Sequence, residues 1–201
     1  MKTGYFDSAT AKYYDENGKT AFIKYKSVIA ELVKISYRIE QRTIFTEKLR
    51  KYAFSLSNRL MKDGSDFGDT KYCVLAKITD RGYEYLNPEL LSECDNVIAV
   101  NDEYGAVADE LLSFIKNEAV SRSTPVICCY NPFLQYSIER LILPSAKTAI
   151  CRSSSFCKVE NANRRIHYER FCDMNELGRS KQTLNFNKKI IKELLPNCHQ
   201  I

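Results

Sequence analysis

Short apolar runs separated by helical stretches constrain the fold of this chain more than any other feature. Residues 96–100 (NVIAV) and 125–130 (PVICCY) are almost entirely apolar, as in strands that are covered on both faces of a parallel sheet. Between these runs, residues 106–120 place Leu111, Leu112 and Ile115 on one face of a helix. This alternation predicts an α/β fold, a three-layer parallel sheet with covering helices.

The same pattern of apolar residues predicts the remaining elements of the C-terminal part. Strands are expected at 72–78, 146–151 and 165–171, a short helix near 134–140, and a closing helix from about 177 to 195.

The N-terminal part has a different residue pattern. No Gly or Pro occurs between residues 19 and 63, and apolar residues recur at helical spacing. This pattern predicts one very long helix, or a helical hairpin with a bend near residues 40–43. Residues 63–69 (DGSDFGD) are the clearest linker. We therefore expect an N-terminal helical extension over 1–64, with a strand remnant at 4–10, and an α/β domain over 65–201.

Basic residues are concentrated in that extension. Residues 22–62 hold ten Lys and Arg against three Glu, a net charge of +7, whereas the whole chain carries +5. A basic helical face could bind nucleic acid. A solvated helix face, or a surface for a protein partner or a second copy of the chain, explains the charge as well, and no aromatic RNA-binding motif accompanies it.

Composition argues for a cytoplasmic protein with no membrane partner. No apolar run approaches the roughly 18 residues that span a bilayer, and the N-terminus has no apolar signal region. The eight cysteines form no C-x-x-C pair, and neither histidine stands at zinc-finger spacing from such a pair. We expect free thiols, no metal site and no bound cofactor.

The junction after the strand at 96–100 is where an α/β protein of this pattern would carry its chemistry. In a P-loop protein this junction reads G-x-x-x-x-G-K-[ST], in which backbone N–H groups wrap the phosphates, Lys neutralises them and Ser/Thr binds Mg²⁺. If Leu111-Leu112 marks the usual apolar start of the helix, the consensus glycines become Asp102 and Val107. The Lys becomes Ala108, the Ser/Thr becomes Asp109, and only Gly105 remains inside the loop.

These substitutions predict a loop that no longer binds phosphate. Asp109 and Glu110 are expected to cap the helix N-terminus, where carboxylates are favourable, and to occupy the place of the phosphate. A carboxylate about 4 Å from a phosphate charge opposes binding by about 4 kcal/mol at an effective dielectric constant near 20.

Around this junction the chain resembles a family of bacterial P-loop ATPase-like proteins built from two tandem nucleotide-kinase-like repeats. Residues 75–86 (LAKITDRGYEYL) are similar to the lead-in to the phosphate loop, and residues 137–144 (SIERLILP) and 149–151 (AIC) to later segments. The resemblance covers about 72–195 and implies a P-loop NTPase-type sheet. Acids that the family often carries after two strands are replaced by Leu134 and Arg152, so the family's nucleotide chemistry does not transfer.

Arg164, Arg165, His167 and Arg170 form a second candidate, because arginines on the lid of a nucleotide kinase bind phosphates. Without a phosphate loop, a strand with alternating exposed charges explains them as well. We expect no catalytic residue and a non-catalytic binding or scaffolding protein, with a protein partner or a homodimer through the N-terminal helices. The alternatives are residual binding or hydrolysis of ATP or GTP with Mg²⁺, and nucleic-acid binding through residues 22–62.

Overall fold

The computed structural model describes residues 8–61, 69–74, 76–79, 82–85, 89–134 and 136–197. Its helices are α1 (Ser8–Gln41), α2 (Thr46–Leu60), α3 (Glu89–Ser92), α4 (Ala106–Ser121), α5 (Met174–Arg179) and α6 (Lys181–Asn197), with short 3₁₀ helices η1 (Pro144–Ala146) and η2 (Tyr168–Phe171). Its strands are β1 (Thr70–Val74), β2 (Ala76–Thr79), β3 (Gly82–Tyr85), β4 (Asn96–Asn101), β5 (Val126–Tyr130), β6 (Ile138–Leu143), β7 (Thr148–Ser153) and β8 (Arg164–His167).

The N-terminal helical stretch is divided at the predicted bend. The chain turns after α1 through a hydrogen bond from the Thr43 N–H to the Glu40 carbonyl, and the Phe45 N–H then bonds the Phe171 carbonyl before α2 begins. The predicted strand remnant at 4–10 is wrong for residues 8–10, which belong to α1. Its other residues lie outside the described part of the chain.

Six strands form one mixed sheet in the order β1-β5-β6-β7-β4-β8, and β2 and β3 form a separate antiparallel pair. The prediction of a wholly parallel sheet is wrong, because β6 is antiparallel to both β5 and β7. The predicted helix near 134–140 is also wrong, since β6 begins at Ile138. Only short connections separate β6 from its two neighbours, and such connections allow antiparallel but not parallel pairing.

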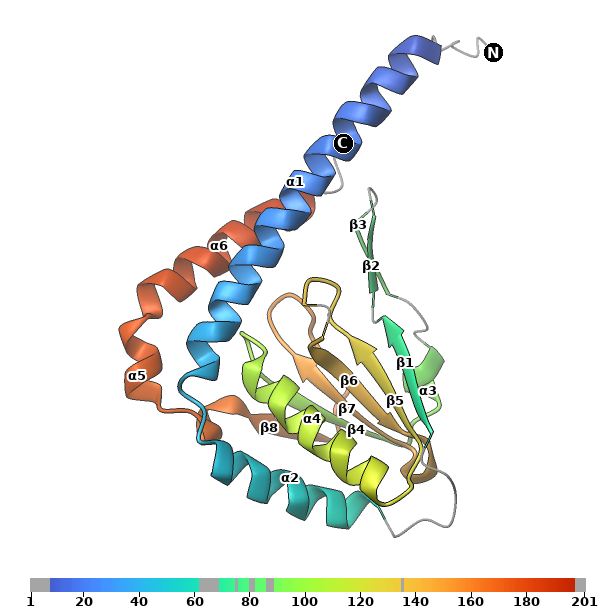
Figure 1. Ribbon diagram of the computed structural model, residues 1–201, viewed down its shortest axis with the longest axis vertical. Helices are drawn as coiled ribbons and strands as arrows, with labels where there is room; N and C mark the ends of the chain where they lie inside the picture. The colour runs from blue at the N-terminus through green and yellow to red at the C-terminus, as the bar shows by residue number, and fades with distance from the viewer. Residues whose placement is uncertain are drawn as a thin grey trace.

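Helices α4 and α2 cover one face of the sheet and the one-turn α3 lies against the other, which is consistent with a three-layer α/β fold (Figure 1). On one face, α4 packs its buried Leu111, Leu112 and Ile115 against the sheet, and α2 packs beside α4. On the other face, Ile142, Ala149 and Cys151 pack against groups that include Leu91 of α3.

The main hydrophobic core includes residues from both predicted domains. Leu49 and Leu56 of α2 belong to the same cluster as Leu111 of α4 and Ile150 of β7. The predicted boundary at residue 64 therefore does not separate two hydrophobic cores.

The middle of α1 packs against α6, so the chain's first and last helices lie side by side (Figure 1). Ile29 and Ile191 are buried between them, and the Asn187 side-chain amide donates to the Ser36 hydroxyl at 3.1 Å. Among the described residues, none of the helices combines the length and apolar character that crossing a membrane requires.

Candidate functional site

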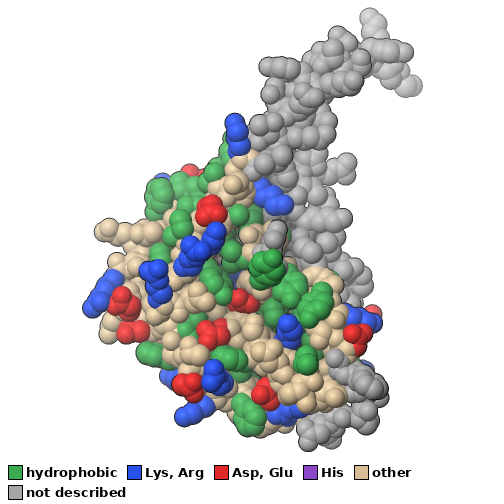
Figure 2. Space-filling model, viewed as in Figure 1, with side chains coloured by type: hydrophobic (Ala, Val, Ile, Leu, Met, Phe, Trp, Pro, Cys, Tyr) green, Lys and Arg blue, Asp and Glu red, His purple; other side chains and the backbone are tan. Residues whose placement is uncertain are grey.

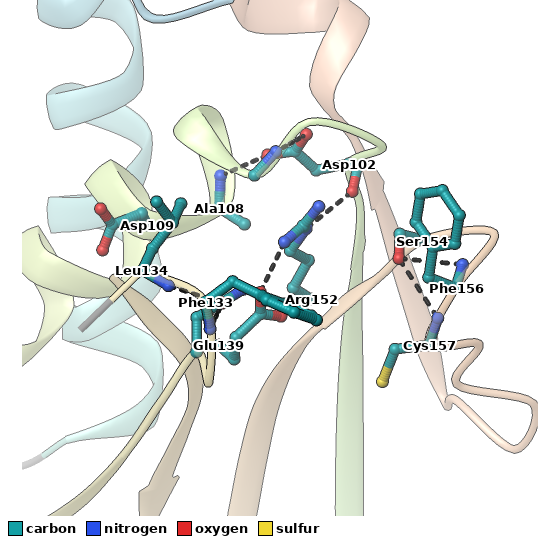
Figure 3. A network of polar contacts seen from close by, with 12 residues as sticks. Asp102, Ala108, Asp109, Phe133, Leu134, Glu139, Arg152, Ser154, Phe156 and Cys157 are labelled. Carbon is teal, nitrogen blue, oxygen red and sulfur yellow. Dashed lines mark hydrogen bonds and ion pairs between the residues drawn. The ribbon is translucent and has the colours of Figure 1, made fainter. Parts of the chain in front are cut away.

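At the β4–α4 junction, the backbone N–H groups of residues 104–106 and 108 all bond carboxylates, and we call this set of groups the amide cradle. Most of them bond the side chain of Asp102. Asp102 is buried, and its Oδ1 accepts hydrogen bonds from the N–H groups of Tyr104 at 3.0 Å and Gly105 at 2.8 Å. Its Oδ2 accepts from the Ala108 N–H at 2.8 Å (Figure 3). Amides turned inward at a helix N-terminus form an anion-binding concavity. Here the anion is the carboxylate of the residue that opens the loop.

Gly105 gives the loop its shape. It lies at the N-cap of α4 with φ of 98°, in the left-handed region that glycine adopts at little cost. Gly105 was the one internal glycine of the degenerate motif, and its position explains why a glycine is needed there even though no phosphate loop consensus surrounds it.

A second carboxylate reaches the cradle from the end of α1. Oε2 of Glu40 accepts a hydrogen bond from the Ala106 N–H at 2.7 Å, and the side chain is fully buried. Burial raises the pKa of Glu40 well above its usual value, the charge of Asp102 raises it further, and the Ala106 hydrogen bond lowers it by less. These influences favour the protonated form of Glu40.

Arg152 of β7 ties this loop to the sheet. Its Nε donates to the Asp102 carbonyl at 3.0 Å and its Nη2 to the Glu103 carbonyl at 2.7 Å. Nη1 pairs with the buried Glu139 of β6 (Figure 3). Burial lowers the pKa of Arg152, but the charges of Glu139 and Asp102 raise it by more, so the guanidinium is cationic. All three nitrogens of the guanidinium are therefore engaged by the protein itself.

Asp109 does not cap the helix in the predicted way. Its Oδ2 accepts a hydrogen bond from the Tyr37 hydroxyl at 2.7 Å, and its Oδ1 accepts from the Ile138 N–H at 2.8 Å. Asp109 thus joins α4 to α1 and β6. The prediction that Asp109 caps this helix is therefore wrong, because Asp102 and Glu40 accept the hydrogen bonds from the amide cradle.

The other two positions of the degenerate motif are core residues. Val107 and Ala108 are fully buried in the main hydrophobic cluster. The side chain at 108, where the P-loop consensus has Lys, therefore contributes to packing rather than to a charged site.

The second candidate site consists of Arg164, Arg165, His167 and Arg170. These residues lie on β8 and η2 but do not converge on one point. Arg164 donates to the Tyr52 hydroxyl at 3.0 Å, and the Arg170 guanidinium lies 5.4 Å from the centre of the Tyr52 ring. Arg165 donates to the Asn101 side chain at 3.2 Å and also to two backbone carbonyls of the preceding loop. His167 is 3.5 Å from the same Asn101 side chain.

The basic residues of the N-terminal helices are likewise partly engaged. Lys34 pairs with Glu31, and Arg50 pairs with Glu47 and lies over the Phe114 ring. On the face shown in Figure 2, blue and red side chains of the described residues are interspersed. No group of three or more His, Cys, Asp or Glu within the described ranges is arranged to hold a metal ion.

Sequence reasoning missed Glu40, Glu139 and the contacts of Arg152. Glu139 lies in the segment that was expected to be a short helix, and Arg152 was noted only as the residue that follows the strand at 149–151. Glu40 lies 66 residues from its hydrogen-bond partner Ala106, and its one signal was an acid at the predicted bend.

The buried Glu40 gives the protein a specific pH dependence. Because its pKa is raised in the folded state, the folded protein keeps a proton that the unfolded chain releases above about pH 4.5. Stability from this group is therefore lost as pH rises from that value towards the folded pKa. Glutamine mimics the protonated acid, so Glu40→Gln is expected to match the wild type near pH 4.5 and to be more stable at pH 8.

Urea unfolding at a series of pH values measures this difference. As pH rises, the difference in free energy of unfolding between Glu40→Gln and wild type should widen by at most about 1.4 kcal/mol per pH unit. Glu47→Gln, at an exposed position on α2, should follow the wild-type profile. Identical pH profiles for Glu40→Gln and wild type would contradict the assignment of a proton to Glu40.

Comparisons of the chain with protein-family models, with curated proteins and with solved structures each find no match. What the chain does is therefore inferred from the residues around α4.

Proposed function

We propose that this chain is an α/β protein of P-loop type that has lost nucleotide chemistry and acts by binding or scaffolding another protein. One observation carries the proposal. The amides at the start of α4, which would bind phosphate in a P-loop protein, bond the protein's own Asp102 and Glu40.

Electrostatics support the loss of phosphate binding. A phosphate in the cradle would have to displace the buried Asp102 carboxylate or lie beside it. At about 4 Å and an effective dielectric constant near 20, the repulsion between the two charges is about 4 kcal/mol. Arg152, the cation that bonds this loop, already bonds Glu139 and two carbonyls, so little positive charge is left to offset this repulsion.

The local architecture supports the P-loop type. Buried strand β4 runs into a loop with a left-handed glycine and then into α4, and β4 is parallel to both of its neighbours, β7 and β8. A strand, a glycine-bearing loop and a helix in this order are the parts of a phosphate loop. The order of β4, loop and α4 matches these parts, while Ala108 and Asp109 stand where the consensus has Lys and Ser/Thr.

The N-terminal helices support a role in protein binding. Val28 and Ile35, two turns apart on α1, are 46% and 41% exposed, and Phe186 of the adjacent α6 is 61% exposed. The first part of α1 extends beyond the sheet and its covering helices (Figure 1). A protein partner or a second copy of the chain would cover such apolar side chains.

Calorimetric titration with ATP and GTP, with and without Mg²⁺, tests the proposal. At about 0.1 M salt, no binding heat is expected up to millimolar nucleotide. Binding in the micromolar range would contradict the proposal, and dependence on Mg²⁺ would favour residual nucleotide binding. The same titration with single-stranded nucleic acid distinguishes the remaining alternative, because affinity that falls steeply with salt marks a nucleic-acid binder.

A further inference from the structure

Two cysteines on neighbouring strands lie in direct contact away from the β4–α4 junction. Cys73 of β1 and Cys129 of β5 are register partners in the parallel pair, and their sulfur atoms are 2.7 Å apart. This separation is below the roughly 3.5–4.0 Å that suits non-bonded carbon atoms and above the disulfide bond length of about 2.05 Å. Neighbouring strands are about 4.8 Å apart, which is within the Cα separation that a disulfide accepts.

The two thiols differ in exposure. Cys73 is half-buried on β1, an edge strand of the sheet, whereas Cys129 is 2% exposed. A reagent in solution therefore reaches Cys73 first, and Cys129 is placed to react with whatever Cys73 has bound.

A buried arginine lies next in the same row across the sheet. Arg140 of β6 is the register partner of Cys129 on one side and of Cys151 of β7 on the other. It is 7% exposed, and its Nε has no hydrogen-bond partner among the residues that the structure describes. Burial and the contact with Cys73 raise the pKa of the Cys129 thiol, and the charge of Arg140 opposes this rise. An adjacent cation favours the thiolate, which is the reactive form of cysteine.

We propose that Cys73 and Cys129 form a reversible disulfide, made by exchange with a small-molecule disulfide such as oxidised glutathione, and that Arg140 is a positioning residue that stabilises the Cys129 thiolate. In the first step the Cys73 thiolate attacks one sulfur of the oxidant, forms a mixed disulfide and releases one thiolate. In the second step the Cys129 thiolate attacks the Cys73 sulfur and releases the other. Two protein thiols are oxidised to the disulfide, and the oxidant is reduced to two thiols, which take up the two protons that the protein thiols lose.

The test incubates the full chain in buffers of reduced and oxidised glutathione, blocks remaining thiols by alkylation and analyses the peptides by mass spectrometry. The expected product is one intramolecular cross-link between the peptides that hold Cys73 and Cys129, removed by dithiothreitol. Because the link joins strands distant in sequence, it should raise Tm by about 5–10 °C. Cys73→Ser should abolish both effects, while Cys157→Ser, at another half-buried cysteine, should leave them unchanged. Free Cys73 and Cys129 under oxidising conditions, or a link from either to another cysteine, would overturn the proposal.

Arg140→Met tests the role of the cation separately. If loss of the charge raises the thiol pKa by about one unit, the thiolate fraction falls tenfold and the higher nucleophilicity recovers about threefold. The second step should then be about threefold slower, and the mixed disulfide at Cys73 should accumulate. Arg140→Lys keeps the charge and should keep the rate, and it serves as the folded comparison if the Met variant does not fold. An unchanged rate in Arg140→Met, or a Lys variant as slow as Met, would overturn the assignment of Arg140.

Discussion

Arg152→Met is expected to lower the free energy of unfolding by about 3–5 kcal/mol, because it removes one partner of a buried ion pair. The guanidinium bonds Glu139, which is 6% exposed, and the carbonyls of Asp102 and Glu103. Methionine is unbranched like the stem of arginine but shorter, and it has no hydrogen-bond donor. The variant therefore leaves a buried carboxylate without its cation and two carbonyls of the loop without a donor. Urea unfolding followed by circular dichroism measures the loss.

Two further variants separate this effect from a general cost of replacing arginine. Arg179→Met removes an arginine that also pairs with a glutamate, but both of those side chains are at least half exposed, so a loss below about 1 kcal/mol is expected. Adding Glu139→Gln to Arg152→Met removes the stranded charge and should recover part of the loss, giving a coupling energy in a double-mutant cycle. A loss below about 1 kcal/mol in Arg152→Met itself would show that the buried pair does not hold the loop.

Gly105→Ala is expected to lower the free energy of unfolding by about 2–5 kcal/mol. The φ of 98° at this position costs an L-residue about 1–2 kcal/mol. A Cβ atom would also lie 2.8 Å from both Cζ and Nη1 of Arg152, and this guanidinium cannot move without losing its hydrogen bonds. Such overpacking adds about 1–3 kcal/mol. Chemical unfolding measures the sum.

The chain offers a matched control for this substitution. Gly178 lies inside α5, and a Cβ there would meet no atom within 4 Å. Gly178→Ala should therefore be neutral or stabilise the protein by about 0.5–1 kcal/mol. In the Arg152→Met background, Gly105→Ala should cost less than in the wild type, because a flexible side chain replaces the fixed guanidinium. Equal losses in the two backgrounds would mean that contact with Arg152 contributes nothing to the effect.

Regular spacing within short segments was enough to predict most elements. The apolar run at 96–100 predicted β4, and the helical spacing of Leu111, Leu112 and Ile115 predicted α4. The break between α1 and α2 was placed correctly near residue 40. These features depend on neighbours within a few turns or residues, so a single sequence contains the information.

In segment 138–143, the residue pattern was not enough to predict the secondary structure. All six residues of β6 are buried, including Glu139 and Arg140. A strand buried on both faces has no alternation of polar and apolar residues, so its period does not distinguish it from a short helix. The short connections on either side of β6 require antiparallel pairing. That β6 pairs with both β5 and β7 is seen only in the assembled sheet.

The sequence by itself determined that the β4–α4 junction does not match the phosphate-loop consensus. In the register set by Leu111-Leu112, Ala108 and Asp109 stand where that consensus has Lys and Ser/Thr. Which carboxylates bond the amides instead was decided by the tertiary structure. Glu40 approaches Ala106 from another helix, and Arg152 approaches the loop from β7. The same holds for Cys73 and Cys129, which only the pairing of β1 with β5 brings together. Local patterns reflect interactions along the chain, whereas the partners of buried polar groups are set by which segments the fold packs against one another.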